Sequence, residues 1–245
     1  MLYGIIADIH SNLEALEVVL NALKPCDKLI CVGDIVGYGP NPNECIELMI
    51  RNQVLCVAGN HDKAAVYRHS TQYFNENAKL AIQWTQSVLT DKSKEFLIEL
   101  PLIAHQAEMQ IVHGSLRSPL DEYIDSVAKA LPTFSWMRSR LCFVGHTHKP
   151  IFFGRTHDGN FEGRDLNDED EILVDDYEKI IINPGSVGQP RVGNKRASFG
   201  IYNDKTKIFS LHKEAYPILK TQKKMQEENL PQQLIDRLSA SSNKI

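Results

Sequence analysis

The sequence predicts an α/β protein in which helices cover a parallel sheet and a second sheet follows further along the chain. Strand-like apolar runs alternate with amphipathic helical segments in the first 60 residues, and short β runs cluster between residues 151 and 211. The chain has 245 residues. A single domain of that length buries roughly 70–75% of its unfolded surface, so a large core can form without disulfides.

Three strands alternate with two helices at the start of the chain. The strand runs span residues 2–7, 28–32 and 54–58 and are largely apolar, as expected for strands covered on both faces. The first helix begins near Ser11, whose spacing to Glu14 matches a capping box. The second begins at residues 41–44, with Pro42 in the first helical position. The β-α-β-α-β order predicts parallel strands.

The rest of the chain predicts more helices and then a second sheet. Residues 63–100 are amphipathic and predict helices, whereas 109–112 and 141–144 predict strands separated by an irregular stretch with Pro119 and Pro132. The remaining β runs predict antiparallel pairing in the second sheet, and they span residues 151–153, 179–182, 197–202 and 208–211. Residues 213–245 predict a C-terminal helix with a frayed tail.

An acidic segment interrupts these β runs at residues 155–180. It holds ten acidic and three basic residues, a local net charge of −7. Clusters of like charge repel one another and are usually solvated. The segment therefore predicts an exposed loop or hairpin rather than a metal site.

Composition excludes several classes of function. The net charge of −4 opposes binding of nucleic acid or an anionic membrane by bulk electrostatics. No apolar run approaches the ~20 residues of a membrane helix, and the N-terminus lacks a signal-peptide pattern. The five cysteines form no C-x-x-C pair, so we expect neither disulfides nor a thiolate zinc site. The expected location is the cytoplasm.

Metal-binding side chains follow five of the strand runs. They are Asp8, His10, Asp34, Asn60, His113, His146 and His148. Ligands gather at the carboxyl ends of strands in open α/β sheets, so we expect these side chains to converge. Seven ligands are too many for one tetrahedral zinc ion but suit two ions. Mixed oxygen and imidazole donors favour divalent or trivalent transition metals, with manganese first and iron, zinc, cobalt or nickel as alternatives.

These motifs together resemble the calcineurin-like metallophosphoesterases. The matching residues are Asp8-x-His10, Gly33-Asp34, Gly59-Asn60-His61-Asp62, His113 and Gly145-His146-Thr147-His148. Residues 33–40 and 183–186 are similar to the small bacterial and archaeal phosphodiesterase-like branch, although Asn183-Pro184-Gly185-Ser186 is also typical of a tight turn. The resemblance spans residues 1 to about 212 and implies one domain there, a four-layer α-β-β-α sandwich of two mixed sheets flanked by helices.

The resemblance also implies a role for each site residue. Asp8, His10, Asp34 and His148 would hold one metal ion, and Asp34, Asn60, His113 and His146 the other, with Asp34 bridging. His61 would be the proton donor, oriented by Asp62, although Asp62 equally suits a helix cap. Asn12, Arg117 and Arg191 are candidates for substrate binding, and both arginines also suit an ordinary exposed surface.

The implied function is dinuclear phosphoester hydrolysis. Hydroxide shared by the two ions would attack phosphorus in line while His61 protonates the leaving oxygen. A phosphodiesterase acting on a small or nucleotide-type substrate is expected, with dinucleoside-polyphosphate hydrolysis or phosphomonoester hydrolysis as alternatives. A non-catalytic scaffold of the same fold is disfavoured because no ligand is missing. We expect no stable nucleic-acid or membrane partner and leave a homo-oligomer open.

Overall fold

In a computed structural model of the chain, residues 1–191 and 195–239 are described and form two six-stranded mixed sheets. The first has the order β3-β2-β1-β11-β12-β9, with β1 Leu2–Ile6, β2 Lys28–Cys31, β3 Leu55–Cys56, β9 Glu171–Leu173, β11 Ala197–Asn203 and β12 Ile208–Glu214. The second has the order β4-β5-β6-β10-β7-β8, with β4 Ile103–Gln106, β5 Met109–Val112, β6 Leu141–Phe143, β7 Pro150–Thr156, β8 Phe161–Asp165 and β10 Tyr177–Pro184.

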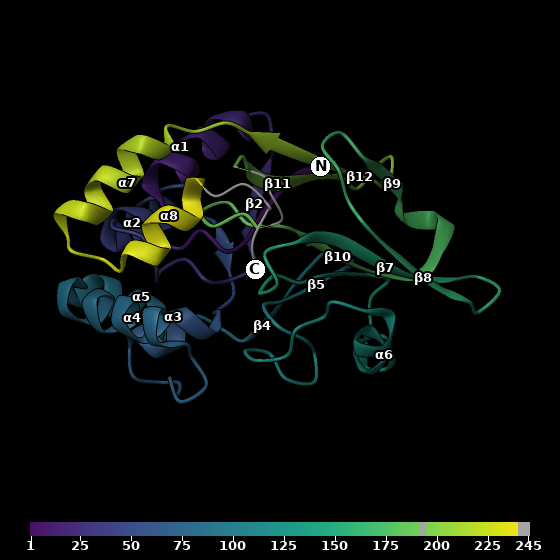
Figure 1. Ribbon diagram of the computed structural model, residues 1–245. Helices are drawn as coiled ribbons and strands as arrows, with labels where there is room; N and C mark the ends of the chain where they lie inside the picture. Colours follow the sequence, from purple (N-terminus) through teal and green to yellow (C-terminus); the bar gives the residue numbers. More distant parts are fainter. Residues whose placement is uncertain (192–194, 240–245) are drawn as a thin grey trace.

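Helices flank the sheets in the expected four-layer arrangement (Figure 1). They are α1 Leu13–Ala22, α2 Pro42–Arg51, α3 Asn60–Ala65, α4 Glu76–Val88, α5 Asp91–Glu99, α6 Val127–Trp136, α7 Ile218–Glu227 and α8 Gln232–Ser239. Residues of α1 and α2 pack on the outer face of the first sheet, and α6 covers the outer face of the second. The predicted sandwich is confirmed.

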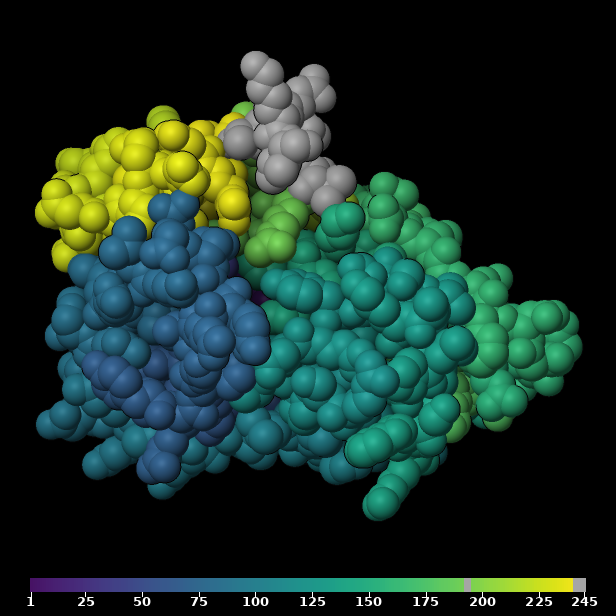
Figure 2. Space-filling view, turned by 60° about the horizontal axis from the view of Figure 1, so that its bottom comes forward, coloured from purple at the N-terminus to yellow at the C-terminus, as the bar shows by residue number. Residues whose placement is uncertain are grey.

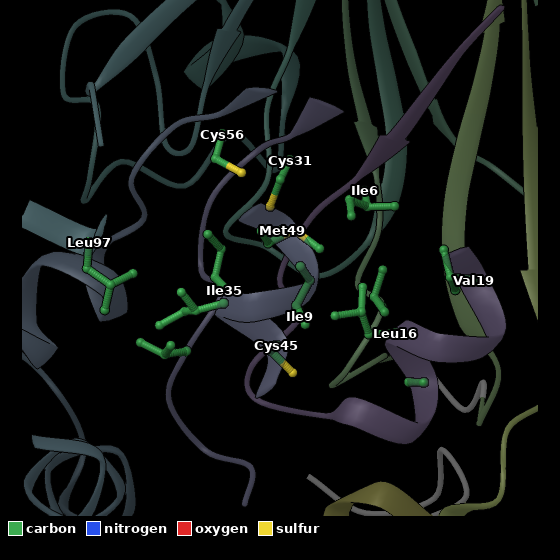
Figure 3. Close-up of a cluster of buried hydrophobic side chains, with 14 of the residues drawn as sticks. Ile6, Ile9, Leu16, Val19, Cys31, Ile35, Cys45, Met49, Cys56 and Leu97 are labelled. Carbon is green, nitrogen blue, oxygen red and sulfur yellow. The ribbon is translucent and has the colours of Figure 1, made fainter. Parts of the chain in front are cut away.

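Side chains that alternate between the two faces of each strand divide the core into layers. Ile5 belongs to the cluster between the two sheets, whereas the adjacent Ile6 packs with Leu16 and Val19 of α1, as Figure 3 shows. In the second sheet Ile180 faces the other sheet, and Ile181 packs with residues of α6. Successive side chains of a strand point to opposite faces, so continuously apolar strands can bury both sides.

The parallel strands direct their carboxyl ends to one region. β1, β2 and β3 are parallel neighbours in the first sheet, and β5, β6 and β10 are parallel neighbours in the second. The loops that follow these strands carry the predicted ligands. This arrangement places the site at the edge where both sheets end.

The predicted sheet membership of residues 197–202 and 208–211 is wrong. β11 and β12 lie in the first sheet, where β11 pairs antiparallel with β1, from Leu2 opposite Asn203 to Ile5 opposite Gly200. The chain crosses from one sheet to the other after Pro184, at the edge that carries the site. Proximity in sequence suggested that these strands join the second sheet. Instead, β11 pairs with the edge of β1 that β2 leaves free.

Two local expectations also change. The irregular stretch contains α6 with Pro132 inside it, because the helix buries Ala130, Thr133 and Phe134, and this packing outweighs the ~3 kcal/mol cost of an internal proline. The cap of α1 is Asn12 rather than Ser11, since the Asn12 side chain accepts from the Ala15 N–H.

The acidic segment contains the hairpin that was one of its two predicted forms, and the C-terminal region contains two helices where one was predicted. The hairpin pairs β7 with β8, and the segment then continues into β9 and the 3₁₀ helix Val174–Asp176. The C-terminal region forms α7 and α8, which pack against Tyr38 and residues of α4. Residues 240–245, the expected tail, lie outside the described part of the chain.

Candidate metal centre

The seven predicted ligands meet at the edge where the sheets end, and each side chain is at most 6% exposed. Two groups of carboxylate and imidazole donors have their ligand atoms within 4.8 Å of one another. One group contains Asp8, His10, Asp34 and His148, and the other contains Asp34, His113 and His146. The first group has the same residues as one set that the resemblance implies, the second group has three of the four residues of the other set, and Asp34 belongs to both groups.

The backbone is strained at this cluster. Five ligands adopt the left-handed region, namely Asp8 (φ 53°), His10 (φ 49°), Asp34 (φ 54°), His146 (φ 67°) and His148 (φ 59°). Residues with a Cβ rarely adopt this region because it costs roughly 1–2 kcal/mol. Such strain persists where the surrounding structure enforces it, and it concentrates at functional sites.

His10 and His148 direct unprotonated nitrogens at each other. His10 Nδ1 lies 3.2 Å from the Val36 carbonyl oxygen, and His148 Nδ1 lies 2.8 Å from that of Gln189. A carbonyl oxygen only accepts, so the proton of each ring is assigned to Nδ1. The two Nε2 atoms are 3.0 Å apart, and burial holds the pKa of both rings well below the usual value. Two facing lone pairs at this distance suit two ligands of one cation.

His113 and His146 repeat the pattern on the other side of Asp34. His113 Nδ1 lies 2.9 Å from the Val32 carbonyl oxygen and Nε2 of His146 lies 3.3 Å from that of Asp121. Their inner nitrogens are 3.1 Å apart. Carbonyls that hold the outer nitrogen are the usual second partners of metal-binding histidines, because they fix the tautomer and the ring orientation.

Asn60 completes the second group. Its Oδ1 lies 3.2 Å from His113 Nε2. Asn60 is the first residue of α3 and follows Gly59 in the short segment that connects β3 to this helix. It contributes a neutral oxygen donor, so the predicted ligand joins the cluster without adding negative charge.

The carboxylates show where positive charge is favoured. Burial raises the pKa of Asp8 to about 8. Burial alone would also raise the pKa of Asp34, but His113 and His61 hold it well below its usual value. Asp34 Oδ2 lies 3.4 Å from His113 Nε2 and raises the pKa of His113 to about 9, although burial alone would lower it. The donor set therefore fits two transition-metal ions with Asp34 between them.

His61 lies beside the cluster in an aromatic enclosure. Its ring centroid is 4.5 Å from Tyr38, 4.8 Å from Phe74 and 4.9 Å from His10. Burial lowers the pKa of His61 to about 4. Its Nδ1 is buried without a hydrogen-bond partner in the described part of the chain.

The expected contact between Asp62 and the His61 ring is not found in the structure. Asp62 accepts hydrogen bonds from the N–H groups of Gly59, Ile35 and Val36 at 2.8–3.0 Å. It therefore caps α3 and fastens the loop after β2, which is the alternative that the sequence left open. Any orientation of His61 by Asp62 acts through the backbone.

The three substrate-binding candidates have different environments. Arg191 acts on the pKa of Asp8, His148 and Tyr38, so its charge faces the cluster. Arg117 instead forms an ion pair with Glu122, and no contact with the ligands is found within residues 1–191 and 195–239. Asn12 is 1% exposed, and its amide bonds the Gly188 carbonyl, so it serves the loop packing.

One contact of the site was missed from the sequence, and the turn that the resemblance puts beside the site proves to support the ligands. Tyr123 stacks on His146 with ring centroids 3.9 Å apart and hydrogen-bonds Arg191. Nothing in the local sequence around Tyr123 signals this contact, which depends on tertiary folding. The turn at 183–186 also supports the ligands directly, because the Asn183 amide bonds the Gly145 carbonyl and the Ser186 hydroxyl bonds that of Asp8.

The family profile described as "Calcineurin-like phosphoesterase superfamily domain" matches residues 1–207. The chain belongs to this family. It is similar to the uncharacterised protein MJ0912 of Methanocaldococcus jannaschii, with 39% identity over 247 residues and 96% of each chain covered.

Solved structures of similar proteins have the same fold. The metallophosphoesterase of Sphaerobacter thermophilus matches this calcineurin-like phosphoesterase with a TM-score of 0.88 and 39% identity, over 98% of each chain. Protein PH1004 of Pyrococcus horikoshii OT3 shares the fold, with a TM-score of 0.82 at 20% identity over 100% of this chain and 99% of the other.

This calcineurin-like phosphoesterase is a phosphoric ester hydrolase of a family that depends on two metal ions. The buried carboxylate and imidazole cluster is the candidate metal centre. Among the described residues, no helix has the length and apolar character needed to cross a bilayer.

Proposed function

We propose that this phosphoesterase is a phosphodiesterase that acts on small or nucleotide-type substrates with two transition-metal ions, of which manganese is favoured. The facing unprotonated nitrogens of His10 and His148, 3.0 Å apart, carry this proposal, because that arrangement suits a cation. Among the described residues one arginine, Arg191, faces the cluster, and it matches the one negative charge of a diester.

Each residue of the site has a separate role in the proposed reaction. When bound, the ions supply Lewis-acid chemistry, because they neutralise phosphate charge and lower the pKa of water. Arg191 orients the phosphate, and Tyr123 holds the guanidinium group in place. His61 gives a proton to the leaving-group oxygen, and the negative charge of a bound phosphate raises the pKa of His61 towards a useful value. Free cysteines throughout the described chain support a cytoplasmic location.

Metal analysis and a substrate panel test the proposal. The protein is loaded with manganese, its metal content is measured, and turnover is compared on bis-p-nitrophenyl phosphate, p-nitrophenyl phosphate and nucleotides that include a dinucleoside polyphosphate. We expect about two ions per chain and the highest kcat/KM on a diester. An Asp34→Asn variant, purified in parallel, controls for contaminating phosphatases. Faster turnover of the monoester contradicts the diesterase assignment, and no turnover of any substrate supports a scaffold.

A further inference from the structure

A cationic cavity lies directly beside the candidate metal centre. Its volume is about 120 Å³, and His148 forms part of its wall. Three basic residues, Lys149, Arg191 and Lys213, line it together with one acidic residue, Asp165. The ends of β7, β8, β11 and β12 contribute its walls. Figure 2 shows the light-green segment that precedes β11 between the C-terminal helices and the teal part of the chain.

No carboxylate of the described residues lies at ion-pair distance from the three cations of this cavity. Within residues 1–191 and 195–239, neither Lys149 nor Lys213 forms an ion pair. Nε of Arg191 is buried without a hydrogen-bond partner. Lys213 is half-buried, and burial lowers its pKa. Unpaired cations in a partly desolvated cavity favour an anionic ligand.

Neighbouring acidic residues do not cancel this charge. Asp168 lies near Lys213 but bonds Arg196 at 2.6 Å and the backbone N–H of Lys213 at 2.8 Å. Asp170 is held by Arg164 at 2.7 Å. Three cations, Lys149, Arg191 and Lys213, against Asp165 leave the cavity with a formal charge of +2.

We propose that this cavity binds a second phosphate group carried by the substrate, next to the phosphodiester that lies at the metal centre. The inference rests on the proposed phosphodiesterase function and specifies its substrate class as nucleotides with an additional phosphate. Arg191 faces both places and lies between the two phosphates. The volume of about 120 Å³ is sufficient for a phosphate group.

A pair of matched esters tests this. The manganese-loaded protein hydrolyses thymidine 5′-(p-nitrophenyl phosphate) with and without a 3′-phosphate, and the ratio of the two kcat/KM values is measured. We expect the 3′-phosphate to raise kcat/KM about tenfold, because two charge-assisted contacts in a half-open cavity contribute roughly that factor. In the Lys149→Gln/Lys213→Gln double variant the ratio falls to near one, and Lys213→Arg restores part of it. Lys205→Gln, on the exposed β11–β12 turn, keeps the wild-type ratio.

Calorimetric titration with inorganic phosphate separates a substrate-borne group from a free anion. Equal kcat/KM values on the two esters overturn this inference but leave the proposed function standing. If the double variant then also loses a phosphate-binding event, the cavity binds a free anion instead. Hydrolysis of neither ester overturns the proposed function and this inference with it.

Discussion

Asp34 is the residue on which both ligand groups depend. Its Oδ2 lies 3.6 Å from His10 Nε2 and 3.4 Å from His113 Nε2, whereas His148 belongs to one group only. We therefore expect Asp34→Asn to weaken both metal sites and His148→Ala to weaken one. After dialysis against manganese, emission spectroscopy should find well below one ion per chain in Asp34→Asn and about one in His148→Ala. Equal loss in the two variants contradicts the bridging position.

His61 has a different test, because its proposed role depends on the leaving group. A p-nitrophenolate leaves without much protonation, whereas a nucleoside alkoxide needs a proton. His61→Ala should lower kcat on a dinucleotide by ~10²–10⁴-fold and on bis-p-nitrophenyl phosphate by much less.

His105→Ala, on the exposed surface of β4, is the matched control and should change neither rate. Metal content must stay at the wild-type level in His61→Ala for the comparison to hold. An equal loss on both substrates assigns His61 to positioning rather than to proton transfer.

At the scale of elements, the start of α3 packs closely against the ligand Asp34 of the metal centre. Gly59 precedes Asn60, and a Cβ on Gly59 would lie 2.0 Å from Asp34 Oδ1 and 2.4 Å from the Asp34 backbone nitrogen. Gly59→Ala must therefore displace Asp34 or the start of the helix. We expect it to lower both manganese content and the melting temperature.

Gly159→Ala is a suitable comparison for this element. A Cβ there meets nothing within 4 Å, although the φ of +86° makes alanine costly by roughly 1 kcal/mol. It should lower the melting temperature slightly and leave manganese content unchanged. Wild-type metal content in Gly59→Ala contradicts the steric explanation.

The elements also show which parts of the molecule the sequence could predict. Every ligand lies within five residues of the end of a strand, so local apolar runs located Asp34 and His146 before any tertiary information. The partner strand of β1 could not be predicted, because the pairing of β11 with β1 joins residues about 200 positions apart. The contact of Tyr123 with His146 was missed for the same reason. The sequence allowed Asp62 either to orient His61 or to cap a helix, and only the three N–H groups that bond its carboxylate distinguish these two roles.

At the scale of the whole molecule, the C-terminal helices connect the periphery to the site. Met225, Leu234 and Leu238 pack with Tyr38, and Tyr38 in turn contacts His61. Figure 2 shows the yellow C-terminal part resting against the blue segment that includes α3 and α4. Displacement of α7 and α8 would open the aromatic enclosure of His61 to water.

The ion pairs of Glu14 fasten these helices, and they make the attachment depend on pH. Glu14 of α1 is 1% exposed and lies 2.6 Å from Lys224 and 3.3 Å from Lys220 of α7. Burial alone would raise the pKa of Glu14, but the two lysines hold it below its usual value. A carboxylate with a lowered pKa stabilises the fold above its unfolded pKa, and this stabilisation is lost as pH falls through the folded pKa.

Glu14→Gln should therefore lower the free energy of unfolding at pH 7 by about 1–2 kcal/mol, the size of one lost charge-assisted hydrogen bond. The difference between variant and wild type should shrink as pH falls below about 4.5, because Glu14 of the wild type then becomes protonated as well. Urea denaturation at a series of pH values measures both quantities.

Glu17→Gln, one turn away on the exposed face of α1, should show neither effect. A Glu14→Gln deficit that stays constant down to pH 3 shows that packing of the side chain, rather than its charge, holds α7 in place.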